Sequence, residues 1–106
     1  MTLIHHLAFA SEWQSAQVSG EYRRSTVGKS LDDEGFIHAS LPDQVAATYR
    51  RYYSELPEVV LLTIDTDLLA SPWQFDAVGT TEFPHIYGPL NLSAVIAAEP
   101  YELEGQ

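Results

Sequence analysis

The stretch GFIHAS at residues 35–40, followed at once by LPDQ at 41–44, predicts a short strand that runs directly into a helix. Its side chains alternate in the period of an extended chain, so that His38 and Ser40 share one face. Ser40 suits the cap of the following helix, and Pro42 suits its first turn. Such a junction favours either an anion-binding site at the helix N-terminus or an ordinary turn with a hydrogen-bonded histidine.

The remaining pattern places helices early and strands late in the chain. Two helices are predicted, from Ser11 to Gly20 and from Leu41 to Ser54, where Pro57 follows. Strands are predicted at Leu3–Ala8, Val59–Ile64, Trp73–Val78 and Val95–Tyr101. This order indicates an α+β fold with a mixed, mostly antiparallel sheet, formed as a single domain over residues 1–106.

The sequence supports more specific structural predictions for three segments. Residues 21–34 show little periodicity and predict a long loop of the kind that is often functional or mobile. Residues 82–88 are predicted to begin in a loop, because Pro84 cannot donate to a central ladder. The strand from Val59 is apolar on both faces, which is typical of the middle of a sheet, so Leu61 and Ile64 are expected to be buried.

Composition restricts the class of partner. Of the formal charge of −10, nine acidic side chains and no Lys or Arg lie in residues 52–106. Binding to duplex nucleic acid is not expected without a cationic surface. The phosphates of a small anionic ligand would instead meet the N-terminal half, where Arg23 and Arg24 lie. The chain has no cysteine, no long apolar run and no signal-peptide pattern, so we expect a cytoplasmic protein that does not span a membrane.

The histidines are the candidate functional residues. His5, His6, His38 and His85 lie within or beside predicted strands, and Glu82 lies three residues before His85. Imidazoles with a carboxylate can bind a metal, but no tight spacing such as HExxH supports this, and no metal is predicted. They can also position a ligand, with Glu82 stabilising developing positive charge. For His5, a hydrogen-bonded strand residue is the favoured interpretation.

Four motifs resemble a known family. They are IHHL at 4–7, GFIHAS at 35–40, VVLLTID at 59–65 and FPHIYGPL at 83–90. Together they are similar to a small bacterial family catalogued as a domain of unknown function, number nine-five-two. Its members are sometimes labelled glutathione S-transferase domain-containing. That label finds no support here, because no thioredoxin-like opening is visible and 106 residues cannot hold a two-domain transferase.

The resemblance implies a fold similar to the ADP-ribosyltransferases, with NAD as substrate. It assigns the residue that binds the ribose to His6 and the residue near the nicotinamide to His38. The third role falls on Glu82, with His85 as its competitor. Ser40 matches the small polar residue that closes the second motif.

Under the same resemblance, Tyr87 lines the pocket, and Arg23 and Arg24 are expected at the phosphates. The implied activities are ADP-ribosyl transfer or 2′-phosphotransferase-like chemistry. The alternative is a non-catalytic domain of the same fold that binds another small molecule. The oligomeric state cannot be deduced from these residues.

Overall fold

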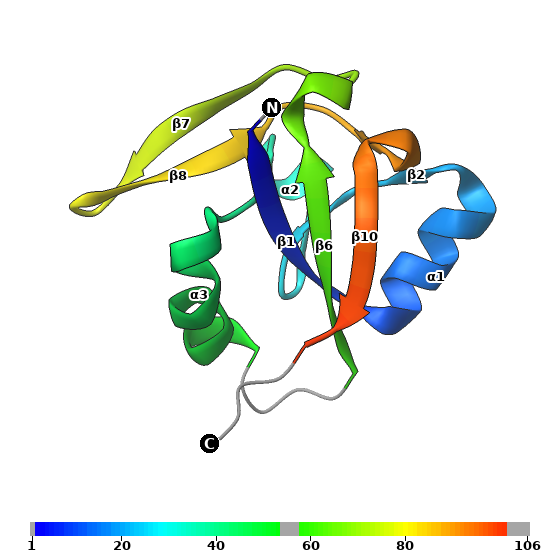
Figure 1. The fold of residues 1–106 in the computed structure, drawn as a ribbon, viewed down its shortest axis with the longest axis horizontal. Helices are drawn as coiled ribbons and strands as arrows, with labels where there is room; N and C mark the ends of the chain where they lie inside the picture. Colours follow the sequence, from blue (N-terminus) through cyan, green and yellow to red (C-terminus); the bar gives the residue numbers. More distant parts are fainter. Residues whose placement is uncertain (1, 54–57, 102–106) are drawn as a thin grey trace.

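A three-stranded antiparallel sheet forms the centre of the protein in a computed structural model that describes residues 2–53 and 58–101. Strand β6 (Val59–Asp65) lies between β1 (Leu3–Phe9) and β10 (Val95–Pro100) (Figure 1). The α+β class, the mostly antiparallel pairing and the central position of the Val59 strand are thus confirmed.

A second antiparallel sheet carries most of the predicted site. Here β8 (Thr81–Ile86) lies between β5 (Ile37–His38) and β7 (Trp73–Val78). The hairpin of β7 and β8 projects beyond the central sheet at the upper left of Figure 1. The two sheets meet where the backbone N–H of His5 donates to Ser40 O and that of Ser40 donates to His5 O, both at 2.7 Å.

Helices α1 (Ala10–Ser19) and α3 (Val45–Tyr52) lie on opposite flanks of the central sheet (Figure 1). Gly20 ends α1 as predicted, in the left-handed conformation that glycine tolerates. The expected start at Ser11 is wrong by one residue, since α1 begins at Ala10 and Phe9 precedes it without a side-chain cap. Pro57, predicted to stop the second helix, lies outside the described residues.

The expected long loop at residues 21–34 is wrong, because this segment is built from short elements. They are β2 (Glu21–Tyr22), β3 (Arg24–Thr26), β4 (Lys29–Ser30) and α2 (Leu31–Glu34). Strand β2 pairs with β9 (Leu90–Asn91), and β3 pairs with β4. Elements of two to four residues are too short to show a period. A reciprocal capping box between Ser30 and Asp33 nevertheless starts α2.

Two predictions about the junctions are also wrong. Ser40 does not cap a helix: its hydroxyl lies 3.2 Å from that of Thr48, and a 3₁₀ turn at Pro42–Gln44 intervenes before α3. Pro84 lies inside the middle strand β8, not in a loop. Its carbonyl accepts from Ala39 N at 3.0 Å, but it has no N–H to return, and β5 ends just before this point.

The core lies between the sheets and consists mainly of large apolar side chains. Ile4, Leu62, Ile64, Ile86 and Leu90 are fully buried in one cluster. The prediction of burial is therefore confirmed for Ile64, whereas Leu61 faces the other side of β6 and is only half-buried. Within residues 2–53 and 58–101, no helix has both the length and the apolar character needed to cross a membrane. Two further 3₁₀ turns, Thr66–Leu68 and Leu92–Ala94, connect the strands.

Candidate functional site

The pleat of the second sheet brings separate polar residues onto one face. His38 pairs directly with His85 across β5 and β8, and His85 pairs with Gln74 across β8 and β7. Asp76 follows Gln74 at the two-residue spacing of a strand and so shares this face. The ring of Phe36 stacks on that of His85, with a centroid distance of 4.0 Å. One sheet face therefore collects two imidazoles, a carboxylate and an aromatic ring.

A chain of hydrogen bonds fixes the orientation of these imidazoles. Nδ1 of His85 lies 2.8 Å from the Asp76 carboxylate, and Nε2 of His85 lies 3.2 Å from Nδ1 of His38. The carboxylate can only accept, so Nδ1 of His85 carries a proton that it donates to Asp76. We assign Nδ1 of His38 as the donor and Nε2 of His85 as the acceptor of the second hydrogen bond. This leaves a lone pair on Nε2 of His38, which none of the described residues uses.

The carboxylate at the end of this chain is held in its ionised form. Tyr87 OH and Gln74 Nε2 both donate to Asp76, and these hydrogen bonds lower the pKa of its carboxyl. In contrast, burial lowers the pKa of His38 to about 4, and the nearby His85 and His6 act in the same direction. His38 is therefore a neutral hydrogen-bond acceptor at pH 7.

His6 lies behind His38 and has both ring nitrogens engaged. Nδ1 donates to the His38 carbonyl at 2.6 Å, so Nε2 is the acceptor for Tyr22 OH at 2.8 Å. Burial lowers the pKa of His6 to about 4, so its ring stays neutral. His6 therefore positions the strand that carries His38 and offers no free nitrogen. We call Tyr22, His6, His38, His85 and Asp76 the histidine network.

A cleft of about 150 Å³ opens beside His38 and His85. We call it the histidine cleft, and its lining residues are Thr26, Glu34, Phe36, His38, Tyr52, Val78 and His85. The Glu34 carboxylate accepts from Ser25 Oγ at 2.8 Å, and Ser25 Oγ in turn accepts from His38 N at 3.3 Å. The cleft thus combines aromatic walls with one carboxylate and a neutral imidazole acceptor.

The predicted catalytic residues are only partly brought together. His38 and His85 share the cleft, and His6 contacts it through the backbone of His38. Glu82 is exposed and lies an odd number of residues from His85 on the same strand, so its side chain points to the opposite face of β8. His5 lies on the other face of β1 from His6, where its Nδ1 is 3.3 Å from Thr63 Oγ1.

The predicted ligand-binding residues fall into three places. Tyr87 joins the histidine network through Asp76, and Ser40 is buried against Thr48. Arg23 and Arg24 line a separate groove of about 660 Å³ between α1 and the strands β2 and β3, which we call the arginine groove.

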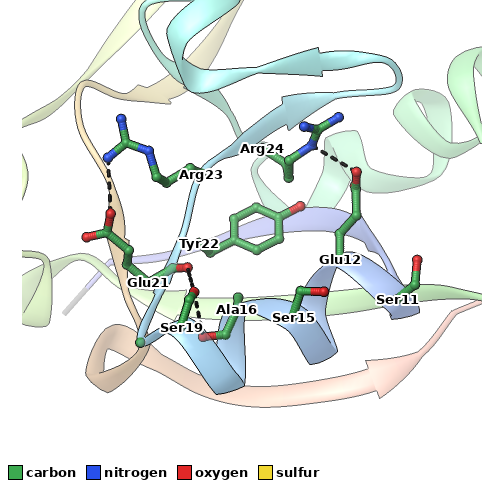
Figure 2. Close-up of a pocket in the computed structure, with 10 residues that line it drawn as sticks. Ser11, Glu12, Ser15, Ala16, Ser19, Glu21, Tyr22, Arg23 and Arg24 are labelled. Atoms are coloured by element: carbon green, nitrogen blue, oxygen red, sulfur yellow. Dashed lines mark hydrogen bonds and ion pairs between the residues drawn. The ribbon is translucent and has the colours of Figure 1, made fainter.

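The charges of the arginine groove are already paired within the protein (Figure 2). Arg24 Nε lies 2.8 Å from Glu12, while Arg23 contacts Glu21 at 3.1 Å and Asp32 at 2.9 Å. Figure 2 also shows Tyr22 in the groove, between α1 and the strand that carries Arg24. The Tyr22 hydroxyl that bonds His6 thus connects the arginine groove to the histidine network.

Asp76, Glu34 and Phe36 are among the site residues that the sequence analysis did not assign to the site. Asp76 lies nine residues before His85 and is brought to it by the register of β7 and β8. Glu34 lies only four residues before His38, but the short helix α2 that positions it has no recognisable period. Phe36 shares the face of His38 by alternation, which the GFIHAS stretch already indicated. Across the described part of the chain, no group of three or more His, Cys, Asp or Glu side chains is arranged to hold a metal ion.

Comparisons with known proteins place the chain in a family. A family model described as "Protein of unknown function (DUF952)" matches residues 7–98. The crystal structure of protein CC0527 from Caulobacter crescentus is 30% identical with a TM-score of 0.85, covering 98% of this chain and 90% of that one. Its solution NMR structure is 29% identical with a TM-score of 0.79, covering 99% and 89%. No curated protein matches the chain significantly.

Proposed function

The chain belongs to this family of proteins of unknown function, and we propose that it binds NAD or a related nucleotide in the histidine cleft and transfers ADP-ribose to an acceptor. The placement of the fold with the ADP-ribosyltransferases is part of the proposal. The observation that carries it is the unused lone pair on Nε2 of His38, oriented by Asp76 and His85 at a cleft with aromatic walls.

The histidine cleft fits a flat heterocycle that carries a hydrogen-bond donor. The carboxamide N–H of a nicotinamide ring would donate to Nε2 of His38, and the ring would pack beside Phe36 and Tyr52. His38 and His85 fix each other through their hydrogen bond, so the acceptor is oriented before the ligand arrives. Preorganised polar groups in an apolar cleft are the usual source of orientation in small-molecule sites.

The remainder of such a ligand would extend toward the arginine groove. Arg24 and Thr26 are two residues apart on β3, a rise of about 7 Å, and they line the groove and the cleft respectively. The pyrophosphate would then lie near Arg24 and Arg23. Binding would exchange Glu12 for a phosphate as the ionic partner of Arg24, whose buried Nε has no hydrogen-bond acceptor among the described residues.

The proposed reaction breaks the bond between C1′ of the ribose and the nicotinamide nitrogen. The bonding electron pair goes to that nitrogen, and neutral nicotinamide leaves. An acceptor hydroxyl or water forms the new bond to C1′ and releases its proton. In this step His38 would hold the carboxamide of the leaving group, and the ribose would carry the developing positive charge.

A non-catalytic binding domain is the second candidate. The cleft volume of about 150 Å³ is below the range of about 300–1,000 Å³ typical of small-molecule sites, and it holds a single ring. His38, with a pKa of about 4, is also a weak base at neutral pH. Both observations favour recognition of a ring over proton transfer to His38.

Two measurements separate these functions. NAD binding is measured by calorimetry for the wild type, for His38→Ala and for the double variant Arg23→Ala, Arg24→Ala, at low and moderate salt. We expect both variants to weaken binding, and a double variant that binds equally well at both salts would exclude the arginine groove. Release of nicotinamide from NAD with time then identifies a transferase or hydrolase, whereas binding without release identifies the non-catalytic domain.

A further inference from the structure

Glu34 is the one acid among the lining residues of the histidine cleft, and the fold holds it firmly in place. It ends α2, where Gly35 turns the chain at a φ of +84° and leads directly to Phe36. The hydroxyl of Ser25, which is fully buried, donates to the Glu34 carboxylate at 2.8 Å. Ser25 also accepts from the backbone N–H of His38. The carboxylate and His38 are therefore fixed to the same side chain.

The other walls of the cleft are suited to a cation. Aromatic faces attract positive charge, and the Tyr52 ring already holds the guanidinium of Arg51 at 5.3 Å from its centroid. The ring of Phe36 stacks on His85, which supports it from one side. His38 is neutral, because burial lowers its pKa to about 4, so it does not repel a positive ligand at pH 7. Arg51 is the nearby cation and the internal competitor for Tyr52.

From this arrangement we infer that the histidine cleft is a site for a positively charged aromatic ring, of the N-alkylated pyridinium class, and that Glu34 selects its charge. The inference rests on the proposed function and narrows it, since it separates an oxidised nicotinamide ring, which carries a positive charge, from a neutral ring of the same shape. Glu34 is thus the acidic residue that lines this cleft, a position that we predicted for Glu82 from the sequence.

The test compares two probes that differ in charge at the same ring. 1-Methylnicotinamide is the cation and nicotinamide the neutral probe, and their dissociation constants are measured by NMR titration at pH 7. We expect the wild type to bind the cation about fivefold or more tightly than the neutral probe, the range of a partly desolvated cation–aromatic contact. Equal affinities for the two probes would overturn the inference.

Glu34→Gln and Glu82→Gln form a matched pair of variants. Both remove one negative charge, but Glu82 lies on the opposite face of β8. We expect Glu34→Gln to lose most of the preference for the cation and Glu82→Gln to keep it. Equal losses in the two variants would show a general effect of net charge and would contradict the assignment to Glu34.

The Glu34→Gln variant retains an amide oxygen that can accept from Ser25, so the fold is expected to be unchanged, which thermal unfolding and the NMR spectrum check. A second variant, Phe36→Leu, removes the aromatic ring and keeps the charge. We expect it to lower the affinity for the cation while Glu34 still favours the cation over the neutral probe. A preference that disappears in Phe36→Leu but persists in Glu34→Gln would overturn the role of Glu34.

These outcomes are distinct from those of the proposed function. If 1-methylnicotinamide binds with the expected preference but NAD does not bind, the nucleotide function fails and the charge-selective cleft stands. If NAD binds but neither probe shifts the resonances of His38 or Phe36, the ligand uses another surface, and the inference is wrong.

Discussion

Both halves of the histidine network contain a histidine, but the ring nitrogens of that histidine are satisfied differently in the two halves. In the closed half, Tyr22 and His6 are buried, and both nitrogens of His6 have partners. In the open half, His38 and His85 are oriented by Asp76, and Nε2 of His38 is left with a free lone pair at a cleft. A satisfied imidazole supports structure, whereas an oriented and unsatisfied one is available to a ligand.

The same contrast separates the two cavities. The arginine groove is larger, about 660 Å³ against about 150 Å³, yet its arginines are paired with Glu12, Glu21 and Asp32. The histidine cleft is smaller and retains an unused acceptor. Size alone therefore does not decide which cavity is the primary ligand site. The unpaired acceptor in the histidine cleft and the paired arginines in the groove favour the smaller cavity. The following predictions test this contrast, beginning with the largest effect.

Replacing His6 by alanine should have the largest effect on stability. The substitution leaves two buried groups without a partner, the Tyr22 hydroxyl and the His38 carbonyl, and it opens a cavity. Each unpaired buried group costs about 1–3 kcal/mol, so we expect a loss of roughly 3 kcal/mol or more in the free energy of unfolding. Urea denaturation measures this loss. A loss smaller than that of His38→Ala would contradict the structural role assigned to His6 and Tyr22.

Acid should destabilise the protein through the same residue. The pKa of His6 is about 4 in the folded state and 6.5 ordinarily, so between these values the unfolded chain binds more protons. The contribution of neutral His6 is complete above pH 6.5 and is lost as the pH falls toward 4, by up to about 3 kcal/mol. Denaturation curves from pH 7 to 4.5 measure the slope.

The control for this pH dependence is His6→Gln, which cannot titrate. Its stability should be lower at pH 7 but should change less between pH 6.5 and 4.5 than that of the wild type. The lowered pKa of Asp76 acts in a different window, because its contribution is lost only as the pH falls below the ordinary value of 3.8. His38, whose pKa is also lowered to about 4, titrates in the same window as His6 and accounts for the slope that remains. An equal slope in His6→Gln would assign the whole effect to His38 and other groups.

Tyr22→Phe should have an intermediate effect. It removes the donor to Nε2 of His6 and leaves one buried lone pair unpaired, while the ring that packs in the core is retained. We expect a loss of about 1–2 kcal/mol in the free energy of unfolding. In a double-mutant cycle with His6→Ala, the loss of stability in the double variant should be smaller than the sum of the losses in the two single variants. Strict additivity would exclude the hydrogen bond as the cause.

How far this site could be predicted from the sequence depends on the length of its elements. Long strands such as β6 and β7 were predicted from their period and apolar character, and β7 has the expected bounds. His38 and His85 were identified from the motifs GFIHAS and FPHIYGPL and from their places within or beside predicted strands, although β5, which carries His38, has only two residues. The strands of two or three residues and the four-residue helix between 21 and 34 have no period, so Glu34 and Ser25 were not assigned to the site.

The assignment of Glu82 shows how one local rule affects a site. Pro84 suggested a loop, and in a loop Glu82 and His85 can approach each other. In the observed strand their separation of three residues places them on opposite faces. Asp76, which contacts His85 instead, is brought there by the register of β7 and β8, a pairing between segments that a single sequence does not specify.

Replacing His38 by alanine should have the smallest effect on stability. Its ring is only partly buried, and its removal leaves one side-chain nitrogen without a partner, Nε2 of His85, whereas removal of His6 leaves two groups. His85 also lines the histidine cleft, which the substitution widens. The backbone contacts of His38 with His6 and Ser25 do not need the side chain. We therefore expect a loss below about 1 kcal/mol in the free energy of unfolding, together with a clear loss of ligand binding. Urea denaturation and NAD titration on the same sample measure both quantities. A stability loss at His38 as large as that at His6, with binding unchanged, would show that the open half is structural as well.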